Sequence, residues 1–423
     1  MYRIAVIGAG YVGLTTAACL SSFGNEVRCS DINSSRIQKL SDGVSPIFES
    51  GLEELLQVSL HSGKLKFSVD NKWAVENADF VFLCLPTPQG ENGEADLSYV
   101  QVAAKEIGPH LKSGSVVVNK STVPVGSTII VESQLHRKDV AVVSNPEFLR
   151  EGSALKDFFN PERIVIGSNY PEATKSMKKL YEWFAAPIIE TDPATAETIK
   201  YAANAFLATK ISFINSVAAM CEVVGADVRV VSRALGYDSR IGSSFLNPGP
   251  GWGGSCFPKD VAAMIRMADD AGYDFSFLKG VVSVNDAQFI RIVDKVKKHL
   301  DGSVTGKKIT ILGLTFKANT DDLRDSPSLK ICELLIKSGA IVSAYDPTVK
   351  KYVEGISSFD NAFDACLGSH AIILATEWDE FKTLDYAKVI VSMENPLIVD
   401  SRNILNPVLM RSLGFIYEGV GHN

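Results

Sequence analysis

Residues 3–20 read RIAVIGAGYVGLTTAACL, and this stretch decides how the chain begins to fold. It opens with a short apolar run suited to a buried strand, continues with three glycines spaced GxGxxG, and ends in an apolar segment of helical composition. The next apolar run, EVRCSD at residues 26–31, reads as a second strand. Strand, glycine turn, helix and strand in this order predict a βαβ unit of a parallel sheet.

Similar apolar, β-branched runs recur along the chain and predict further buried strands. In the first half they are FVFLCLP, SVVVNKS and VAVVSNP, and in the second half GKKITILGLTFK, SGAIVSAYDP, HAIILAT and NPLIVDSR. Between the halves, Asp192 is a suitable cap and Pro193 a suitable early residue for a helix whose pattern continues to Gly225. This long helix is expected to act as a spine between domains.

These patterns predict an α/β chain of two Rossmann-like, doubly wound parallel-sheet domains joined by a long central helix. We place a dinucleotide-binding domain at residues 1–190, a central helical region at 191–300 and a second Rossmann-like domain at 301–423. The second domain opens with a strand and a glycine but lacks the full GxGxxG. It is therefore expected to hold a different ligand, or to have lost the tight turn that binds a pyrophosphate.

The composition is that of a soluble globular protein, with 46% hydrophobic and 22% charged residues in a chain of 423. A formal net charge of −7 argues against a broad surface for nucleic acid or anionic membrane and favours a small anionic ligand. The chain opens directly on a strand, without a basic leader or cleavage site, and has no uninterrupted apolar stretch long enough to span a bilayer. We expect a cytoplasmic protein with neither nucleic acid nor membrane as a partner.

The cysteines are scattered, odd in number and never arranged as CxxC, so neither a disulfide framework nor a metal site is indicated. Reduced thiols fit the cytosol. The seven are Cys19, Cys29, Cys84, Cys221, Cys256, Cys332 and Cys366.

The glycine pattern and an acidic residue point to a dinucleotide. Gly8, Gly10 and Gly13 have the spacing that permits a tight turn, close pyrophosphate approach and tight helix packing. Asp31 ends the second strand, about where an acid binds a ribose 2′-hydroxyl. These residues favour NAD, although Arg36 lies nearby and leaves NADP open. The alternative is a glycine turn that serves packing alone.

Cys256 lies in NPGPGWGGSCFPKD, where glycines leave the backbone free to approach a ligand and Pro258 suits the start of a helix. At a helix N-terminus, the dipole and nearby Lys259 favour the nucleophilic thiolate. An unpaired cysteine without such context is usually buried filler, and the other six keep that interpretation. Cys256 is therefore a candidate nucleophile.

Polar residues of the central helix and of the segment NPEFLREGSA are weaker candidates. Lys200 and Asn204 are four residues apart and share a helix face, which Asn215 continues, so that a cation and an amide can hold an oxyanion. The alternative is a solvated helix face. Glu147 and Glu151 follow a strand end, where ligands of α/β proteins gather, but carboxylates there are as often merely solvated. No histidine falls in these segments, so a histidine base has no candidate.

Together the motifs resemble the UDP-glucose/GDP-mannose dehydrogenase family, and most nearly its UDP-glucose 6-dehydrogenase branch. The likeness covers nearly the whole chain, and several motifs are far more specific than a glycine turn. The matching motifs, in the family's order, are GAGYVG, LPTP, KSTVPVGS, NPEFLREGSA, KYAANAF, GWGGSCFPKD and GLTFKANTDDLRDSP.

The resemblance implies roles for individual residues and an NAD-binding domain, a dimer-forming central helix and a UDP-sugar-binding domain. The implied catalytic residues are Cys256 as nucleophile with Lys200, Asn204, Thr122, Glu147 and Asp260. The implied cofactor residues are Gly8, Gly10, Tyr11, Val12, Gly13, Asp31, Arg36, Thr87, Thr122, Glu151 and Arg324. The implied substrate residues are Phe148, Leu149, Glu151, Lys200, Asn204, Arg240, Phe245, Leu246, Gly253, Lys317 and Arg402. In the family the position of Arg240 reaches the substrate of the neighbouring subunit, which implies a functional homodimer.

The activity that the resemblance implies is a four-electron oxidation of UDP-glucose to UDP-glucuronate, for polysaccharide biosynthesis, with two NAD and with a cysteine thiohemiacetal and thioester. Three alternatives stay open. The first is a dehydrogenase for GDP-mannose or a UDP-N-acetylhexosamine. The second is a two-electron hydroxyacid dehydrogenase of the 6-phosphogluconate type, and the third is a binding protein without chemistry.

Overall fold

The computed structural model describes residues 1–349 and 352–422. By the contacts between its residues the chain divides into two compact units. The first unit comprises Met1–Ala203 and Ala262–Ala271, and the second comprises Asn204–Val261 and Gly272–Asn423. The predicted division at 1–190, 191–300 and 301–423 stays a prediction, because contacts alone divide the chain in two and assign the central region partly to each unit.

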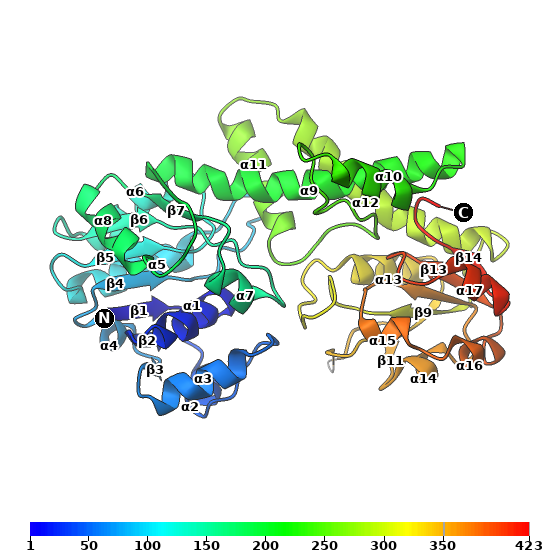
Figure 1. Ribbon diagram of the computed structural model, residues 1–423, viewed down its shortest axis with the longest axis horizontal. Coiled ribbons are helices and arrows are strands. Elements are labelled where there is room, and N and C mark those ends of the chain that lie inside the picture. Colours follow the sequence, from blue (N-terminus) through cyan, green and yellow to red (C-terminus); the bar gives the residue numbers. More distant parts are fainter. Residues whose placement is uncertain (350–351, 423) are drawn as a thin grey trace. The chain divides into compact units, whose positions relative to one another are not determined.

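The first unit is built on an eight-stranded sheet in the order β3-β2-β1-β4-β5-β6-β7-β8 (Figure 1). Every neighbouring pair is parallel except β6 and β7, which meet at a single antiparallel bridge, Ser144 with Gly167. The strands are β1 (Arg3–Ile7), β2 (Glu26–Ser30), β3 (Leu65–Ser68), β4 (Phe80–Leu83), β5 (Val116–Asn119), β6 (Ala141–Ser144), β7 (Ile164–Gly167) and β8 (Ile188–Thr191).

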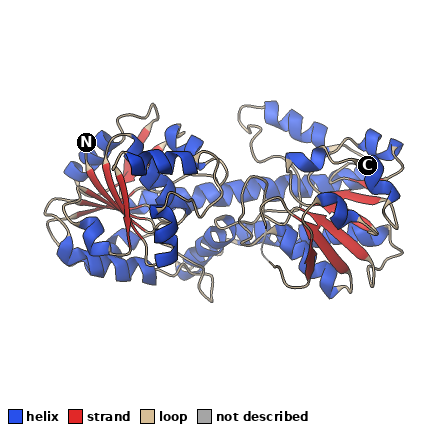
Figure 2. Cartoon of the chain, turned by 90° about the horizontal axis from the view of Figure 1, so that it is seen from below, coloured by secondary structure: helices blue, strands red, loops and turns tan. Residues whose placement is uncertain are grey.

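Helices cover both faces of this sheet, as Figure 2 shows, because alternate strand residues point to opposite sides. In β1, Ile4 and Val6 belong to one apolar core, whereas Ala5 and Ile7 belong to another. The helices are α1 (Tyr11–Ser22), α2 (Ser34–Ser41), α3 (Leu52–His61), α4 (Asn71–Val75), α5 (Ser98–Ile107), the short 3-10 helix η1 (Gly108–His110), α6 (Ser127–Leu135), α7 (Ala154–Phe159) and α8 (Pro171–Leu180).

The second unit repeats this plan with a six-stranded, wholly parallel sheet in the order β11-β10-β9-β12-β13-β14. Its first strand in sequence is third in the sheet, as in the first unit, so the predicted pair of Rossmann-like sheets is confirmed. The strands are β9 (Lys308–Leu312), β10 (Ile341–Tyr345), β11 (Ile356–Ser358), β12 (Ala371–Leu374), β13 (Leu397–Asp400) and β14 (Ile416–Glu418). The helices are α10 (Val228–Tyr237), α12 (Ser276–Lys298), α13 (Pro327–Lys337), α14 (Ala362–Cys366), α15 (Asp379–Lys382), α16 (Tyr386–Val391) and α17 (Pro407–Ser412).

Two helices, α9 (Pro193–Val224) and α11 (Phe257–Asp270), run from one unit into the other. The start of α9 is the predicted one, since Asp192 Oδ1 accepts a hydrogen bond of 2.9 Å from the Thr195 N–H. Its end is also the predicted one, where Gly225 adopts φ +73°. Among the described residues, α9 alone is long and apolar enough to cross a membrane, by length and composition only, and core helices of soluble proteins pass the same test.

Five strands lack a sequence pattern strong enough to predict them: β3, β7, β8, β11 and β14. Three of them, β3, β11 and β14, are edge or near-edge strands with mixed polarity, such as the "ISS" of β11. The exposed edge strand β8 extends to Thr191, so the predicted boundary at residue 190 falls inside it.

Candidate functional site

The GxGxxG turn joins β1 to α1 and leaves no room for side chains at two of its glycines. Gly8 adopts φ +98°, and a Cβ there would lie 2.4 Å from the Cys84 carbonyl oxygen. A Cβ on Gly13 would lie 1.9 Å from the Gly8 oxygen. At Gly10, by contrast, a Cβ would meet nothing within 4 Å, and α1 starts there without a side-chain cap. An open glycine at a helix N-terminus fits a pyrophosphate.

Asp31 lies at the carboxyl end of β2 and ties the glycine turn to the neighbouring loop. Its carboxylate accepts hydrogen bonds of 2.9 Å from the Ala9 and Asn33 N–H groups. The same carboxylate pairs with the Arg36 guanidinium at 2.9 Å. Because the charge of Arg36 is engaged by Asp31, the pair suits a ribose hydroxyl better than a 2′-phosphate, and this favours NAD over NADP.

The second unit has a similar glycine turn after its first strand, β9, but there the acidic residue is buried and bonded to several groups. Gly313 adopts φ +93°, and Asp346 Oδ2 accepts from the Leu314 N–H at 2.7 Å, as Asp31 does from Ala9. However, Asp346 is buried and also bonded to Thr315 and Thr348. Helix α13 starts only at Pro327. The described residues of this half therefore lack the tight pyrophosphate turn, which agrees with the predicted loss of that turn.

Tyr11 starts α1 and connects the glycine turn with the NPEFLREGSA loop. Its hydroxyl bonds with the Glu49 carboxylate, and both groups accept from the Gly152 N–H, at 2.9 and 2.8 Å. Burial raises the pKa of Tyr11 strongly, and its bond to Glu49 adds to the shift. These hydrogen bonds hold Gly152, the residue after Glu151, at the start of α1. Val12, the next residue of α1, packs on the apolar core.

The segment after β5 is held in place from two sides. The Thr87 hydroxyl donates to the Thr122 carbonyl oxygen at 2.8 Å, and both threonines are buried. Glu197 of α9 accepts from the N–H groups of Gly126 (2.7 Å) and Thr128 (3.0 Å) and so caps α6. These bonds join the segment that follows Thr122 to the start of α9.

Glu147 and Lys200 form a buried ion pair. Lys200 Nζ lies 2.9 Å from Glu147 Oε1 and donates to the Glu147 carbonyl oxygen at 2.7 Å, with side-chain exposures of 5% and 6%. The Leu149 N–H donates to the other carboxylate oxygen at 2.6 Å. Burial alone would raise the pKa of Glu147, but Lys200 and the Leu149 N–H more than offset this and lower it. The solvated interpretation of both residues is wrong, because each is buried and paired.

Phe148 lies close to two cations beside this pair. The Arg163 guanidinium is 3.8 Å from the centre of its ring, and Lys200 Nζ is 5.4 Å from it. Stacking of this kind fixes the ring next to Glu147.

Cys256 directly precedes α11, as predicted, and its carbonyl oxygen accepts from the Asp260 N–H at 3.0 Å. It is partly exposed, whereas the other six cysteines, all within the described residues, are buried. Burial raises the pKa of Cys84, Cys332 and Cys366 to about 12, which keeps those thiols protonated. Position and exposure thus set Cys256 apart from the other six cysteines, and its role as nucleophile stays a prediction.

Asn204 and Asp260 meet in the second unit. The Asn204 amide donates to Asp260 Oδ2 at 2.6 Å, and Lys259 Nζ lies 2.5 Å from Asp260 Oδ1. Lys259 therefore forms an ion pair with Asp260. The sequence had predicted that Lys259 favours the thiolate form of Cys256 directly. Ser255 Oγ is 3.5 Å from Cys256 Sγ. Asn204 and Asp260 are thus brought together one helical turn after Cys256, and a joint catalytic role of the three residues stays a prediction.

The glycines before Cys256 serve protein packing. A Cβ on Gly253 would lie 1.9 Å from the Asp325 carbonyl oxygen, and one on Gly254 would lie 2.8 Å from the Phe316 ring. Packing therefore explains why both positions are glycine, and an approach of this backbone to a ligand stays a prediction. Asn215 Oδ1 accepts from the Gly249 N–H at 2.9 Å, so it holds the same segment and does not extend the polar stripe.

The three arginines that are predicted to bind ligands differ in their exposure and in their partners. Arg240 and Arg324 are exposed and pair locally with Asp238 (2.6 Å) and Asp322 (2.7 Å). Arg402 is largely buried and donates to the carbonyl oxygens of Ala375 (2.9 Å) and Phe316 (3.0 Å).

Three remaining candidates lie on the segments that flank these arginines. Lys317 Nζ lies 5.5 Å from the Phe316 ring centre. Phe245 adopts φ +63°, and Leu246 is buried with its carbonyl oxygen accepting from Ser232.

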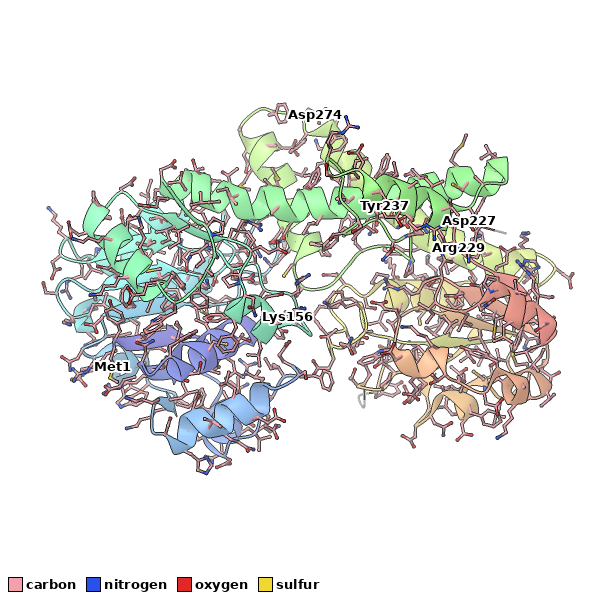
Figure 3. All side chains as sticks on the ribbon, viewed as in Figure 1. Met1, Lys156, Asp227, Arg229, Tyr237 and Asp274 are labelled. Carbon is pink, nitrogen blue, oxygen red and sulfur yellow. The ribbon has the colours of Figure 1, made fainter. Side chains whose placement is uncertain are left out.

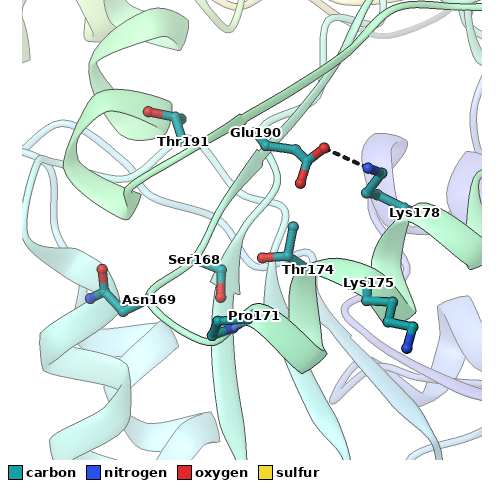
Figure 4. Close-up of a pocket in the computed structure, with 8 residues that line it drawn as sticks. All are labelled: Ser168, Asn169, Pro171, Thr174, Lys175, Lys178, Glu190 and Thr191. Carbon is teal, nitrogen blue, oxygen red and sulfur yellow. Dashed lines mark hydrogen bonds and ion pairs between the residues drawn. The ribbon is translucent and has the colours of Figure 1, made fainter.

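A surface pocket of about 490 Å³ lies elsewhere in the first unit, at the start of α8 (Figure 4). Its wall includes the ion pair Lys178–Glu190, whose Nζ and Oε1 atoms are 2.6 Å apart. None of its lining residues is a predicted site residue. Among the described residues, no group of three His, Cys, Asp or Glu side chains could hold a metal ion.

Sequence reasoning missed several buried residues next to the predicted ones. Their signal was weak: two directly follow the strands β5 and β6, one lies one helical turn before Lys200, and one lies in the loop before α3, where no pattern marks it. They are Glu49, Lys120, Asn145 and Glu197.

Gly13→Ala is expected to lower stability, whereas Gly10→Ala is expected to lower NAD affinity. At Gly13 the methyl group would clash with backbone, so the free energy of unfolding should fall by about 1–3 kcal/mol. At Gly10 the methyl group enters open space and φ is −74°, so stability should be retained while NAD affinity falls by about ten-fold or more. Thermal unfolding and calorimetric NAD titration measure the two effects. Equal stability of both variants would contradict the packing role of Gly13.

Comparison with known families covers nearly the whole chain. Residues 2–185 match the NAD binding domain of the UDP-glucose/GDP-mannose dehydrogenase family, residues 194–287 its central domain, and residues 310–407 its UDP binding domain.

Individual relatives agree with these matches. The chain is 45% identical to the UDP-glucose 6-dehydrogenase TuaD of Bacillus subtilis, with 100% of this chain and 93% of the relative covered. It is 42% identical to the UDP-glucose 6-dehydrogenase of Pseudomonas aeruginosa, with 99% and 97% covered. The solved structure of a UDP-glucose dehydrogenase from Pyrobaculum islandicum aligns with a TM-score of 0.92 at 36% identity, covering 100% of this chain and 98% of that one. With NAD-binding, central and UDP-binding segments in one chain, this protein belongs to the UDP-glucose/GDP-mannose dehydrogenase family.

Proposed function

We propose that this enzyme oxidises the C6 alcohol of UDP-glucose to a carboxylate and uses two NAD for each UDP-glucuronate formed. The observation that carries this proposal is Cys256, the one cysteine outside the core, placed at the start of α11 beside Ser255 and Asp260. A nucleophilic thiol can retain an aldehyde between two oxidations, which a two-electron dehydrogenase does not require. NAD, when bound, accepts one hydride from C6 in each oxidation.

In the first oxidation the C6 hydroxyl loses its proton to a water or lysine held by Asp260. Asp260 suits this task because it is buried and bonded to both Lys259 and Asn204. The C6 carbon becomes an aldehyde as its hydride leaves.

The Cys256 thiolate then forms a carbon–sulfur bond to the aldehyde carbon, and the carbonyl oxygen takes up charge. Lys200 and Asn204 are assigned to this oxygen as donors, one turn apart on α9. Loss of the second hydride and of the hydroxyl proton turns the thiohemiacetal into a thioester.

Hydrolysis breaks the carbon–sulfur bond, as water supplies the second carboxylate oxygen and the thiol regains a proton. Glu147 is assigned as the base that activates this water. Its lowered pKa keeps it ionised in neutral solution, so that it can accept a proton. Its ion pair with Lys200 limits its basicity and orients the carboxylate.

An NAD-reduction assay over a panel of nucleotide sugars tests the proposal. UDP-glucose should give two NADH and one UDP-glucuronate per molecule consumed. One NADH per sugar would support the two-electron hydroxyacid dehydrogenase, and binding without reduction would support a protein without chemistry. Preference for GDP-mannose or a UDP-N-acetylhexosamine would move the proposal to another branch of the family.

We further propose that α9 pairs with a second copy of the chain. Phe206, Phe213 and Met220 are spaced seven residues apart on one face of α9 and are 65%, 54% and 60% exposed. On α10, Val230 and Tyr237 are 52% and 83% exposed, and Figure 3 labels Tyr237. A stripe of large apolar side chains supports a homodimer because a second copy can cover it.

Phe213→Asp should convert the dimer to a monomer, since it places a charge within the apolar stripe. Sedimentation velocity measures the change. Val391→Asp on α16 is the matched control, because Val391 is 84% exposed but lies outside the stripe. A dimeric Phe213→Asp variant would contradict the assignment of this face.

The cytoplasm is the proposed location. All seven cysteines are free thiols, which supports a reducing compartment.

A further inference from the structure

A second buried lysine lies next to the Glu147–Lys200 pair and has no part in the mechanism above. Lys120 follows β5 directly and is buried, with a residue exposure of 7%. The register of β5 and β6 brings Asn119 opposite Ser144, so that Lys120 lies beside Asn145. Lys120 Nζ donates to Asn145 Oδ1 at 3.1 Å.

The surroundings of Lys120 hold its ammonium without neutralising it. Asn145 is an amide, whose oxygen also accepts from the Tyr181 hydroxyl at 2.6 Å and whose nitrogen donates to the Val165 carbonyl oxygen at 2.7 Å. The Tyr181 ring centre is 5.9 Å from Lys120 Nζ. Within the described residues no carboxylate forms an ion pair with Lys120, which is unusual for a buried lysine.

Charged and titratable groups face Lys120 from each neighbouring element: Cys84 after β4, Glu147 after β6, Tyr181 after α8 and Lys200 on α9. Cys84 and Tyr181 stay neutral because burial raises the pKa of each. The charged neighbours are therefore Glu147, two residues beyond Asn145, and Lys200, which is bonded to Glu147. Glu147 has two cations near it, and only Lys200 contacts it directly.

We propose that Lys120 is a positioning residue for the Glu147–Lys200 pair, because its buried ammonium, bonded to Asn145 two residues before Glu147, helps Lys200 to keep Glu147 ionised as the water-activating base in acid solution. This inference rests on the proposed function, since it serves the role assigned to Glu147. Burial lowers the pKa of Lys120 to about 8, and Lys200 adds to this, although Glu147 opposes it. A lysine in this state changes charge within the working range of an enzyme.

The first test compares pH profiles of kcat for acid formation in Lys120→Met and Lys120→Arg. Lys120→Met removes the second cation, so the acid limb that reports Glu147 should move up by about one pH unit. Lys120→Arg keeps a charge at this position, so its acid limb should stay. Tyr181→Phe keeps the ring but removes the bond to Asn145, and its acid limb should also stay.

The second test needs no catalysis. Burying the charged Lys120 costs stability below its folded pKa, and this cost disappears as the pH rises from about 8 to the unfolded value near 10.5. The melting temperature of Lys120→Met relative to wild type should therefore fall as the pH rises from 7 to about 10. The difference for Lys120→Arg should lack this slope.

The outcomes separate this inference from the proposed function. If wild type yields two NADH per sugar but Lys120→Met keeps the wild-type acid limb, or Lys120→Arg moves it as far as Lys120→Met does, the inference is overturned while the function stands. The first burst of NADH should be unchanged in Lys120→Met, because Glu147 is assigned to the later hydrolysis. A burst slowed as much as steady-state turnover would also overturn the inference.

Discussion

Replacing Cys256 by serine is expected to lower acid formation by on the order of 10³-fold or more, while UDP-glucose and NAD still bind. Serine is close to cysteine in volume, but its hydroxyl does not ionise in neutral solution. The Asp260 backbone bond and the start of α11 do not depend on the sulfur. Chromatography of the sugar acid measures the rate, and calorimetry measures the binding of each ligand.

The matched control is Cys221→Ser on α9, which changes a buried thiol to a hydroxyl. It should lower the melting temperature and leave kcat unchanged, because a polar group enters the core. Acid formation by Cys256→Ser at the wild-type rate would remove the thiol from the mechanism.

Lys200→Ala is expected to reduce kcat by about 100-fold, the scale of losing one donor to a developing oxyanion. It also leaves Glu147 buried without its cation, so the free energy of unfolding should fall by about 3–5 kcal/mol. The pKa of Glu147 should rise, since burial is then opposed only by the Leu149 N–H and by Lys120. Turnover measured at saturating substrate, below the melting temperature, separates chemistry from stability.

Lys178→Ala is the surface control for this prediction. Lys178 also pairs with a glutamate, Glu190, but both side chains are nearly half exposed. Water screens such a pair, so its loss should cost at most about 1 kcal/mol and leave kcat unchanged. If Lys200→Ala lowered kcat no more than Lys178→Ala, the assignment of Lys200 to the oxyanion would be wrong.

The candidate site could be predicted from the sequence where its signals are local. Gly8, Gly13 and Asp31 lie within one βαβ unit, and the structure gives each the predicted place. Cys256 could be placed at a helix start because Pro258 and the preceding glycines mark that boundary. In both cases the backbone conformation follows from neighbouring residues, so a short window carries the information.

Partners distant in the sequence were not predictable. Glu147 and Lys200 are 53 residues apart, and Asn204 and Asp260 are 56 apart. Spacing alone could not show whether Glu147 and Lys200 are solvated or functional. The structure shows that both are buried. The packing role of Gly253 was missed for the same reason, since the Asp325 backbone that it contacts comes from a different part of the chain.

The sequence by itself determined two parallel α/β sheets, a glycine turn for a dinucleotide and a thiol at a helix start, because apolar periodicity and turn residues act over short range. Only the tertiary structure decided which charges are buried together, as with Lys120, Glu147 and Lys200. The energy of a buried charge depends on every group packed around it, and those groups come from strands and helices that the chain order does not bring together.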